Sequence, residues 1–261
     1  MDKLFCIRDI SFSYAQKPVF SHLDLDFERG LFYGILGPNG CGKTTLLDLI
    51  LKNRKPDSGN IVYRGNNITC MSRRNIAREL ALVPQDFYIN FPFTVREVVM
   101  MGRHPHIPRF ADPSSKDMDI VTHVMEQMEI EQLAEEHVTN LSGGEKQRVV
   151  FARALAQDTP VIIMDEATSN MDIKHTLQTL DIVSKMVRER GKSVIAAMHN
   201  LNLASAFCDR LVFMKAGHRI ITGDTSDVFN EQNIKDIFEV DSKVYFDMYS
   251  NSKQVIYRHE K

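Results

Sequence analysis

The sequence predicts an α/β fold, with a largely parallel buried sheet, an antiparallel β subdomain and a helical insertion. Three features of the chain lead to this prediction. Residues 31–36 and 161–164 are apolar without alternation, which is typical of strands buried on both faces of a parallel sheet. Residues 4–14 and 23–27 alternate apolar and polar side chains, which indicates half-buried antiparallel strands. Between residues 86 and 158 the strand-like pattern gives way to a helical one.

The composition indicates a folded chain without a strong charge preference. Its 261 residues, 43% of them hydrophobic, suffice for one large domain or two small ones. A formal net charge of -2 gives no reason to expect nucleic acid or an anionic membrane surface as partner. No signal-like start and no bilayer-spanning apolar run are visible, so we expect a cytosolic protein that reaches any membrane through another protein. Four scattered cysteines without a C-x-x-C pair suit a reducing compartment and argue against structural zinc.

A glycine-rich segment follows the first buried strand and leads into a helix-like run at residues 46–51. This order is the context of a phosphate-binding loop, made here of Gly37, Pro38, Asn39, Gly40, Cys41, Gly42, Lys43, Thr44 and Thr45. Glycines let backbone N–H groups close on phosphate oxygens, and the helix N-terminus adds partial positive charge. We expect Lys43 to reach the β and γ phosphates and Thr44 to offer its hydroxyl to Mg²⁺. A plain glycine-rich turn is the alternative, which the complete motif disfavours.

Two more residues of the N-terminal part lie where a ligand could bind. Tyr14 ends the first antiparallel strand, where its ring could stack on an adenine, although chemistry alone favours an ordinary strand-end aromatic. Gln85 lies just beyond the carboxyl end of a short apolar strand, the edge where ligands bind in open α/β sheets. The expected elements between them are a turn at 56–59, a strand at 60–63, a turn at 64–67, a helix at 72–79 and a strand at 80–83.

The helical insertion carries two predicted helix starts. Thr94 and Glu97 have the spacing of a capping box, which opens a helix over residues 95–101. Asp112 followed by Pro113 fits an N-cap with proline at the first helical position, for a helix that runs to about residue 128. The segment between these helices, residues 102–110, cannot be regular helix. Its two histidines, His104 and His106, are better interpreted as surface residues than as metal ligands.

A second anion-binding helix end is predicted at Leu141, Ser142, Gly143, Gly144 and Glu145. Ser142 and Glu145 have capping-box spacing, while the two glycines leave the N-terminal amides uncovered. The alternative is simply a well-capped helix, which runs to about residue 156.

The buried strand at 161–164 ends in two adjacent carboxylates, Asp165 and Glu166. Charged groups there are costly unless they face a cation or water. In a phosphate-loop ATPase the first would hold Mg²⁺ through water and the second could polarise an attacking water. A solvated pair of charges is the alternative, which the apolar strand disfavours.

The remaining chain is predicted to add one further candidate, His199, at the end of a buried strand over 193–198. This histidine is expected at the same sheet edge as Gln85, Asp165 and Glu166. The other expected elements are an amphipathic helix at 172–190 that ends near Gly191, a hairpin of 210–214 and 219–223 turning at Ala216 and Gly217, a helix at 231–238, and strands at 244–249 and 254–258. The tail carries no catalytic feature.

In this order, the motifs closely resemble those of the ATP-binding cassette (ABC) ATPases, over nearly the whole chain. In that resemblance residues 37–45 are the Walker A loop, residues 141–145 with Gln147 the LSGGE signature, and residues 161–165 the Walker B strand. It makes Tyr14 the adenine-stacking aromatic, Gln85 the Q-loop glutamine, Glu166 the catalytic glutamate, residues 169–172 the D-loop and His199 the switch histidine. Three positions depart from the usual pattern, namely Ala167 for proline, Met171 for leucine and Asn200 for aspartate.

The resemblance implies one domain over residues 1–261 with a P-loop NTPase (RecA-like) core. It places the core and β subdomain at 1–85 and 159–225, the helical signature subdomain at 86–158 and a C-terminal extension at 226–261. It implies ATP and Mg²⁺, with the metal held by Thr44, Gln85 and Asp165. It implies ATP hydrolysis served by Glu166, His199, Gln85 and Lys43. Two copies would pair head to tail, so that the signature helix of one copy, with Ser142, Gly143, Gly144 and Glu145, closes over the ATP held by the Walker A loop of the other. Asp172 of the D-loop is a further cofactor-binding residue in this resemblance.

Short motifs at residues 98–106 and 199–202 are similar to those of import ATPases for iron-siderophore complexes, haem and cobalamin. This resemblance implies a peripheral subunit on the cytoplasmic face of the membrane, bound to permease subunits and indirectly to an extracytoplasmic solute-binding protein, without nucleic acid. A soluble ABC ATPase in iron-sulfur cluster assembly or another non-transport role is the alternative. The aromatics Phe87, Tyr88, Phe91 and Phe93 would line a groove for a permease helix, or else form the insertion's own core.

Overall fold

The computed structural model describes residues 2–85, 91–169, 171–215 and 219–258. The chain forms two compact units, Met1–Met71 with Ser193–Lys261, and Ser72–Lys192. Within the described ranges, no helix has the length and apolar character needed to span a membrane. The predicted subdomain boundaries remain a prediction.

The antiparallel sheet of the first unit has the strand order β2-β1-β4-β5. Its strands are β1 (Lys3–Tyr14), β2 (Lys17–Glu28), β4 (Ser58–Tyr63) and β5 (Asn66–Asn67), followed by the 3-10 helix η1 (Ile68–Cys70). Both predicted N-terminal strands are therefore confirmed. Alternate residues such as Phe5 and Ile7 are buried because side chains of a strand point to opposite faces.

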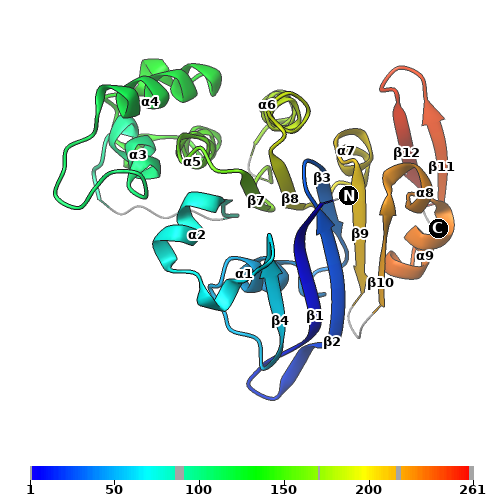
Figure 1. Ribbon diagram of the computed structural model, residues 1–261. Coiled ribbons are helices and arrows are strands. Elements are labelled where there is room, and N and C mark those ends of the chain that lie inside the picture. Colours follow the sequence, from blue (N-terminus) through cyan, green and yellow to red (C-terminus); the bar gives the residue numbers. More distant parts are fainter. Residues whose placement is uncertain (1, 86–90, 170, 216–218, 259–261) are drawn as a thin grey trace. The chain divides into compact units, whose positions relative to one another are not determined.

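The parallel strands of the first unit are buried, except for the two end residues of β9, Arg210 and Lys215. β3 (Phe32–Leu36) lies between β8 (Ser193–Ala197) and β9 (Arg210–Lys215) and runs parallel to both, while β10 (Arg219–Asp224) pairs with β9 antiparallel (Figure 1). The predicted turn at Ala216 and Gly217 lies outside the described residues. The accompanying helices are α1 (Lys43–Ile50), α7 (Leu201–Phe207), α8 (Thr225–Val228) and α9 (Glu231–Phe238).

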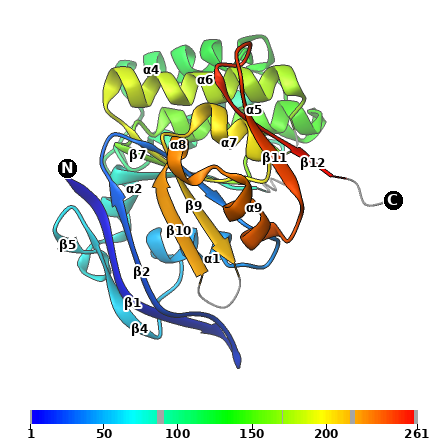
Figure 2. The ribbon, with the colours of Figure 1, turned by 90° about the vertical axis from the view of Figure 1, so that its right-hand side faces the viewer.

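A C-terminal hairpin completes the first unit. Its strands are β11 (Ser242–Asp247) and β12 (Ser252–Tyr257), seen in red and orange in Figure 2. Asn202 of α7 ties β12 down, because its side-chain oxygen accepts from the Val255 N–H at 2.7 Å. The hairpin is therefore packed on α7.

The second unit combines two parallel strands with a group of helices. β6 (Leu80–Val83) pairs in parallel with β7 (Val161–Asp165). The helical elements are α2 (Arg73–Glu79), α3 (Val95–Met100), η2 (Met101–Arg103), α4 (Ser115–Gln127), η3 (Glu131–Leu133), η4 (Val138–Asn140), α5 (Gly143–Ala156) and α6 (Ile173–Arg190). Helices α3, α4 and α5 pack against one another, shown in green in Figure 1.

A buried ion pair holds the helices of this unit together. Arg103 Nε lies 2.8 Å from Asp117 Oδ1, and Arg103 Nη1 donates to the Ala156 carbonyl at 2.8 Å. The Ser114 hydroxyl and Arg103 together lower the pKa of Asp117 to about 2. Because both side chains are buried, each depends on the other to compensate its charge.

The predicted start of α4 at Asp112 and Pro113 is wrong. The helix begins after Ser114, whose hydroxyl accepts from the Asp117 N–H while the Asp117 carboxylate accepts from the Ser114 N–H. A reciprocal capping box satisfies two backbone donors, whereas an aspartate cap followed by proline satisfies fewer. The sequence pattern places Leu177 on the apolar face of α6 together with Leu180 and Val183, but 42% of Leu177 is exposed whereas the other two are buried.

Candidate functional site

The glycines of the phosphate loop are required by close contacts and by backbone conformation. A Cβ on Gly37 would lie 2.2 Å from the Met214 carbonyl oxygen. Gly42, the N-cap of α1, has a φ of 107°, and a Cβ there would lie 2.8 Å from the Phe20 ring. Only glycine adopts this geometry without strain. The loop is therefore held in shape by β2 and by the end of β9.

The start of α1 leaves its backbone donors without a side-chain cap and carries no acidic residue in its first turn. Such a helix end favours an anion through its N–H groups and its dipole. Lys43 is buried and its ammonium donates to the carbonyls of Gly37 at 2.9 Å and Pro38 at 3.4 Å. Thr44 is exposed at the first turn, whereas Thr45 is buried. The loop, the lysine and the helix end thus present positive potential to one place.

Tyr14 lies beside this loop. Its hydroxyl is 3.3 Å from Thr45 Oγ1 of α1, and 40% of the residue is exposed. The guanidinium of Arg54 lies over its ring, 4.6 Å from the ring centre. Arg54 was not predicted, because no local pattern indicates a contact between the end of β1 and the segment after α1.

His199 follows β8 at the edge of the sheet that carries the phosphate loop. The Met198 N–H donates to the Ile35 carbonyl at 3.0 Å, so the ends of β8 and β3 lie side by side. His199 is exposed. The next residue, Asn200, caps α7 by accepting from the Leu203 N–H at 3.1 Å. The first unit thus brings Tyr14, the phosphate loop and His199 to one region.

The second unit brings the other predicted polar residues together. Val83 of β6 is in register with Met164 of β7, so Gln85 and the two carboxylates follow neighbouring strand ends. Asp165 is buried, whereas Glu166 is partly exposed. Glu166 has a φ of 49°, a left-handed conformation that costs a residue with a Cβ about 1–3 kcal/mol. Strain of this kind gathers at functional sites, where surrounding contacts impose it.

The signature segment caps α5 as predicted. The Glu145 carboxylate accepts from the Ser142 N–H at 2.8 Å, and the Ser142 hydroxyl accepts from the Glu145 N–H at 3.4 Å. The Ser142 hydroxyl and N–H lower the pKa of Glu145. A Cβ on Gly143 would meet no atom within 4 Å, so no contact among the described residues requires glycine there. The glycine leaves the helix end open to an approaching group.

Two contacts connect the neighbouring loops to their helices. The buried Gln147 side chain of α5 donates to the Ala167 carbonyl at 2.6 Å, directly after Glu166. Asp172 caps α6, because its carboxylate accepts from the His175 N–H at 2.9 Å. Hydrogen bonds from the His175 N–H and ring lower the pKa of Asp172. Gln147 was predicted only as part of the signature, and its partner was not predicted.

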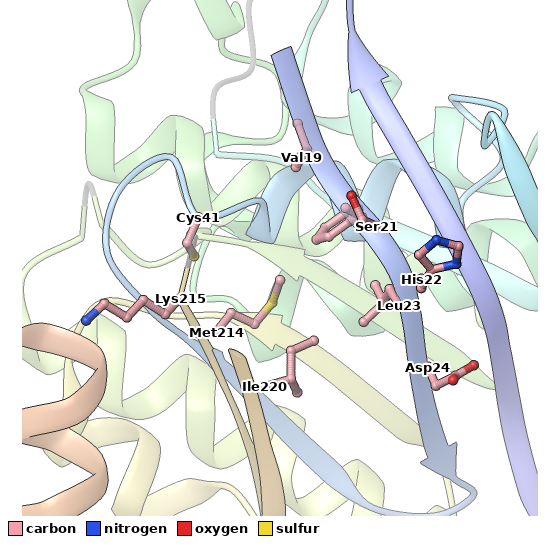
Figure 3. Close-up of a pocket in the computed structure, with 10 residues that line it drawn as sticks. Val19, Ser21, His22, Leu23, Asp24, Cys41, Met214, Lys215 and Ile220 are labelled. Carbon is pink, nitrogen blue, oxygen red and sulfur yellow. The ribbon is translucent and has the colours of Figure 1, made fainter. Parts of the chain in front are cut away.

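Cys41 directs its side chain into a cavity behind the phosphate loop (Figure 3). The cavity has a volume of about 280 Å³ and is lined by β2, β9 and β10, including Leu23, Met214 and Ile220. The thiol is buried. Contact between Cys41 and a nucleotide would therefore involve its backbone.

The predicted aromatic group lies only partly within the described residues, whereas both His104 and His106 are described. Phe91 and Phe93 are 69% and 37% exposed, so the interpretation as core is wrong for these two. Phe87 and Tyr88 lie outside the described residues. His106 has a structural contact, with its Nε2 2.8 Å from the Gln157 carbonyl oxygen.

Comparison with protein families and curated proteins gives a consistent match. The family described as "ABC transporter" matches residues 20–169. The cobalamin import ATP-binding protein BtuD of Halobacterium salinarum is 40% identical over 210 residues, which are 80% of this chain and 52% of the relative. The chain thus spans about half the length of that relative. The achromobactin transport ATP-binding protein CbrD of Dickeya dadantii is 33% identical over 237 residues, 91% of this chain and 88% of the relative.

Solved structures show the same fold. One described as a metal-chelate type ABC transporter in an inward-facing conformation aligns with a TM-score of 0.85 at 26% identity, covering 99% of this chain and 98% of that chain. A dimeric ATP-binding cassette in a post-hydrolysis state bound to ADP and Pi aligns with a TM-score of 0.76 at 25% identity, covering 85% of this chain and 98% of that chain. The predicted fold class is confirmed.

Proposed function

The chain belongs to the ABC transporter family and is one of its ATPases, and from this premise we propose that it is the nucleotide-binding subunit of an importer. The ordered set of motifs from Tyr14 to His199 carries the proposal. In it, the subunit lies on the cytoplasmic face of the membrane and hydrolyses ATP to drive uptake through separate permease subunits.

Binding of the nucleotide is assigned to the first unit's residues. The phosphate loop and the N-terminus of α1 receive the phosphates, and Lys43 exchanges its two loop carbonyls for β and γ phosphate oxygens. Tyr14 stacks on the adenine, and His199 contacts the γ phosphate. The buried ammonium of Lys43 supports this assignment, because a phosphate oxygen is a stronger partner for it than a carbonyl.

Hydrolysis is assigned to the second unit's carboxylates. Glu166 accepts a proton from the attacking water, while Gln85 senses the γ phosphate. Mg²⁺ is assigned to Thr44, Gln85 and Asp165 from the family resemblance, and their hydroxyl, amide and carboxylate oxygens are ligands of the kind that Mg²⁺ takes. Bound Mg²⁺ would be held by these three residues and would neutralise charge on the phosphate oxygens.

We assign the open signature helix end to a second copy of this chain. Ser142, Gly143, Gly144, Glu145 and Asp172 of one copy complete the nucleotide site of the other. Two observations support this assignment, namely the unfilled space above Gly143 and the dimeric cassette among the similar structures. The active form is then a homodimer with two shared sites.

The solute proposed for transport is an iron chelate, haem or cobalamin. The names of the cobalamin and achromobactin relatives support this range, and the exposed Phe91 and Phe93 suit contact with a permease helix. A solute-binding protein outside the membrane would deliver the cargo.

Reconstitution tests the proposed function. The permease that copurifies with this chain is placed in liposomes, and ATP hydrolysis is measured with its binding protein loaded with iron chelate, haem or cobalamin. We expect one loaded form to stimulate hydrolysis above the unloaded form. Copurification with soluble assembly proteins in place of a multispanning permease would contradict the importer assignment.

A further inference from the structure

Arg54 is held in place by the last turn of α1. Lys52 has a φ of 57°, which turns the chain back after the helix. The backbone N–H groups of Asn53 and Arg54 then donate to the Asp48 carbonyl at 2.8 and 3.2 Å. The backbone of Arg54 is therefore fixed against the same helix that begins with the phosphate loop.

The side chain of Arg54 is also held at two points. Its Nε lies 3.3 Å from Asp48 Oδ2, and its guanidinium carbon lies 4.6 Å from the centre of the Tyr14 ring. The other Asp48 oxygen accepts from Asn53 Nδ2 at 3.1 Å. Asp48 thus fixes the direction from which the guanidinium meets the ring. A cation over an aromatic face is attracted by the negative potential of that face.

Tyr14 is restrained from several sides. Its hydroxyl lies 3.3 Å from Thr45 Oγ1, and the Phe12 ring packs against it edge-on with the centres 5.0 Å apart. Only Arg54 covers a ring face with a charge among the described contacts of Tyr14. Removing Arg54 would leave the hydroxyl contact in place while the ring gains freedom to tilt.

We propose that Arg54 is a positioning residue for base recognition: it holds the Tyr14 ring so that adenine stacks on it, and it does not touch the phosphates. The inference rests on the adenine role proposed for Tyr14. A Tyr14 ring that is ordered before the nucleotide binds loses less conformational entropy on binding. Arg54 therefore strengthens the contribution of the base to affinity and leaves that of the phosphates unchanged.

The expected effect follows from the size of such contacts. A partly exposed cation–π pair is weak, so replacing Arg54 by alanine should weaken MgATP binding by about 2- to 5-fold. Lysine also places a cation over a ring but lacks the planar fork that pairs with a carboxylate. Arg54→Lys should therefore retain much of the affinity.

The test compares MgATP with inorganic tripolyphosphate, which carries the phosphates without a base. Dissociation constants for both are measured calorimetrically with the whole chain and with Arg54→Ala, Arg54→Lys, Tyr14→Ala and the Tyr14→Ala/Arg54→Ala double variant. Arg64→Ala is the matched control, because Arg64 lies over the Tyr63 ring at 5.4 Å in the same unit. We expect Arg54→Ala to weaken MgATP alone, and the double variant to bind as Tyr14→Ala does.

Three results would overturn the role of Arg54. These are an equal loss of tripolyphosphate affinity, an unchanged or tighter affinity for MgATP, and a double variant weaker than Tyr14→Ala. A different result would show that Tyr14 does not bind the adenine. In that case Tyr14→Ala itself would leave the ratio of the dissociation constants for MgATP and tripolyphosphate unchanged.

Discussion

Glu166 joins a carboxylate to a left-handed backbone directly after the buried strand β7. Its φ is 49°, and the next residue is fixed by the hydrogen bond from Gln147 to the Ala167 carbonyl. The buried glutamine therefore helps to impose the strained conformation. This arrangement gives the proposed base a defined direction, which general base catalysis requires.

Replacing the Glu166 carboxylate by an amide removes the proposed base and keeps the shape of the side chain. Glu166→Gln should lower the rate of ATP hydrolysis by about 10²- to 10⁴-fold and leave the dissociation constant for ATP unchanged. Glu239→Gln is the control, because Glu239 also has a positive φ, 60°, and ends a helix outside the proposed site. Normal turnover by Glu166→Gln would remove Glu166 from this role.

The three departures from the usual family pattern make ordinary contacts. Asn200 caps α7, a task for which asparagine and aspartate are equally suited. Ala167 offers its carbonyl to Gln147, which requires no particular side chain. The Met171 sulfur lies 3.7 Å from Thr179 Oγ1 of α6. None of these positions removes a group to which a catalytic or binding role is assigned.

At the scale of elements, helix starts could be predicted where one capping motif stands alone. Thr94 with Glu97 and Ser142 with Glu145 form the predicted capping boxes. The start of α4 was missed because two candidate caps lie close together in the sequence. Asp117 serves both Ser114 and the buried Arg103, and that tertiary partner is not visible in a local pattern.

The ion pair of Asp117 with Arg103 should make the stability of the second unit depend on pH. Since the folded pKa is lowered from 3.8 to about 2, the carboxylate stabilises the fold fully above its unfolded pKa. This stabilisation is lost as the pH falls from about 4 towards 2. Asp117→Asn should cost about 3 kcal/mol at pH 7, since it leaves Arg103 buried without its counter-charge.

Urea unfolding of the wild type and of Asp117→Asn at several pH values measures this difference. We expect it to be constant above about pH 5 and to shrink below about pH 4. Asp119→Asn, an exposed change on the same helix, should behave as wild type. A difference between wild type and Asp117→Asn that stays constant down to the lowest pH would contradict the assignment.

Ser142 combines a helix cap with the proposed contact to a second copy. Ser142→Arg should leave ATP binding to the monomer unchanged but prevent ATP-dependent dimerisation, because the long side chain fills the open helix end. Ser142→Asp keeps a good cap and adds a negative charge that repels phosphate, so it should have the same effect without unfolding α5. Each Ser142 variant is combined with Glu166→Gln, and the dimer that forms on addition of ATP is measured by light scattering. Normal dimerisation of both Ser142 variants would refute the shared site.

At the scale of the whole molecule, the buried strands and the ordered motifs made the fold predictable. A continuous apolar run such as residues 161–164 is too short to span a membrane and is typical of a strand buried on both faces of a sheet. The contacts that adjust the site were not predictable. Arg54 over Tyr14 and Gln147 with Ala167 join segments far apart in the sequence, and such contacts depend on tertiary structure.

In the proposed dimer, the phosphate loop of one copy works with the signature helix of another. Mixing two inactive variants tests whether the nucleotide site is shared in this way. Lys43→Ala removes the loop's lysine, and Ser142→Arg blocks the signature. A dimer of one with the other contains one site that lacks both groups and one site in which both are intact.

ATP hydrolysis by an equal mixture of Lys43→Ala and Ser142→Arg is the decisive measurement. Each variant alone should be inactive, whereas the mixture should recover measurable ATP hydrolysis, because only a mixed dimer keeps one intact site that can close on ATP. If the signature served the nucleotide site of its own chain, every site would lack one group. The mixture would then remain as inactive as its components, which would contradict the shared site.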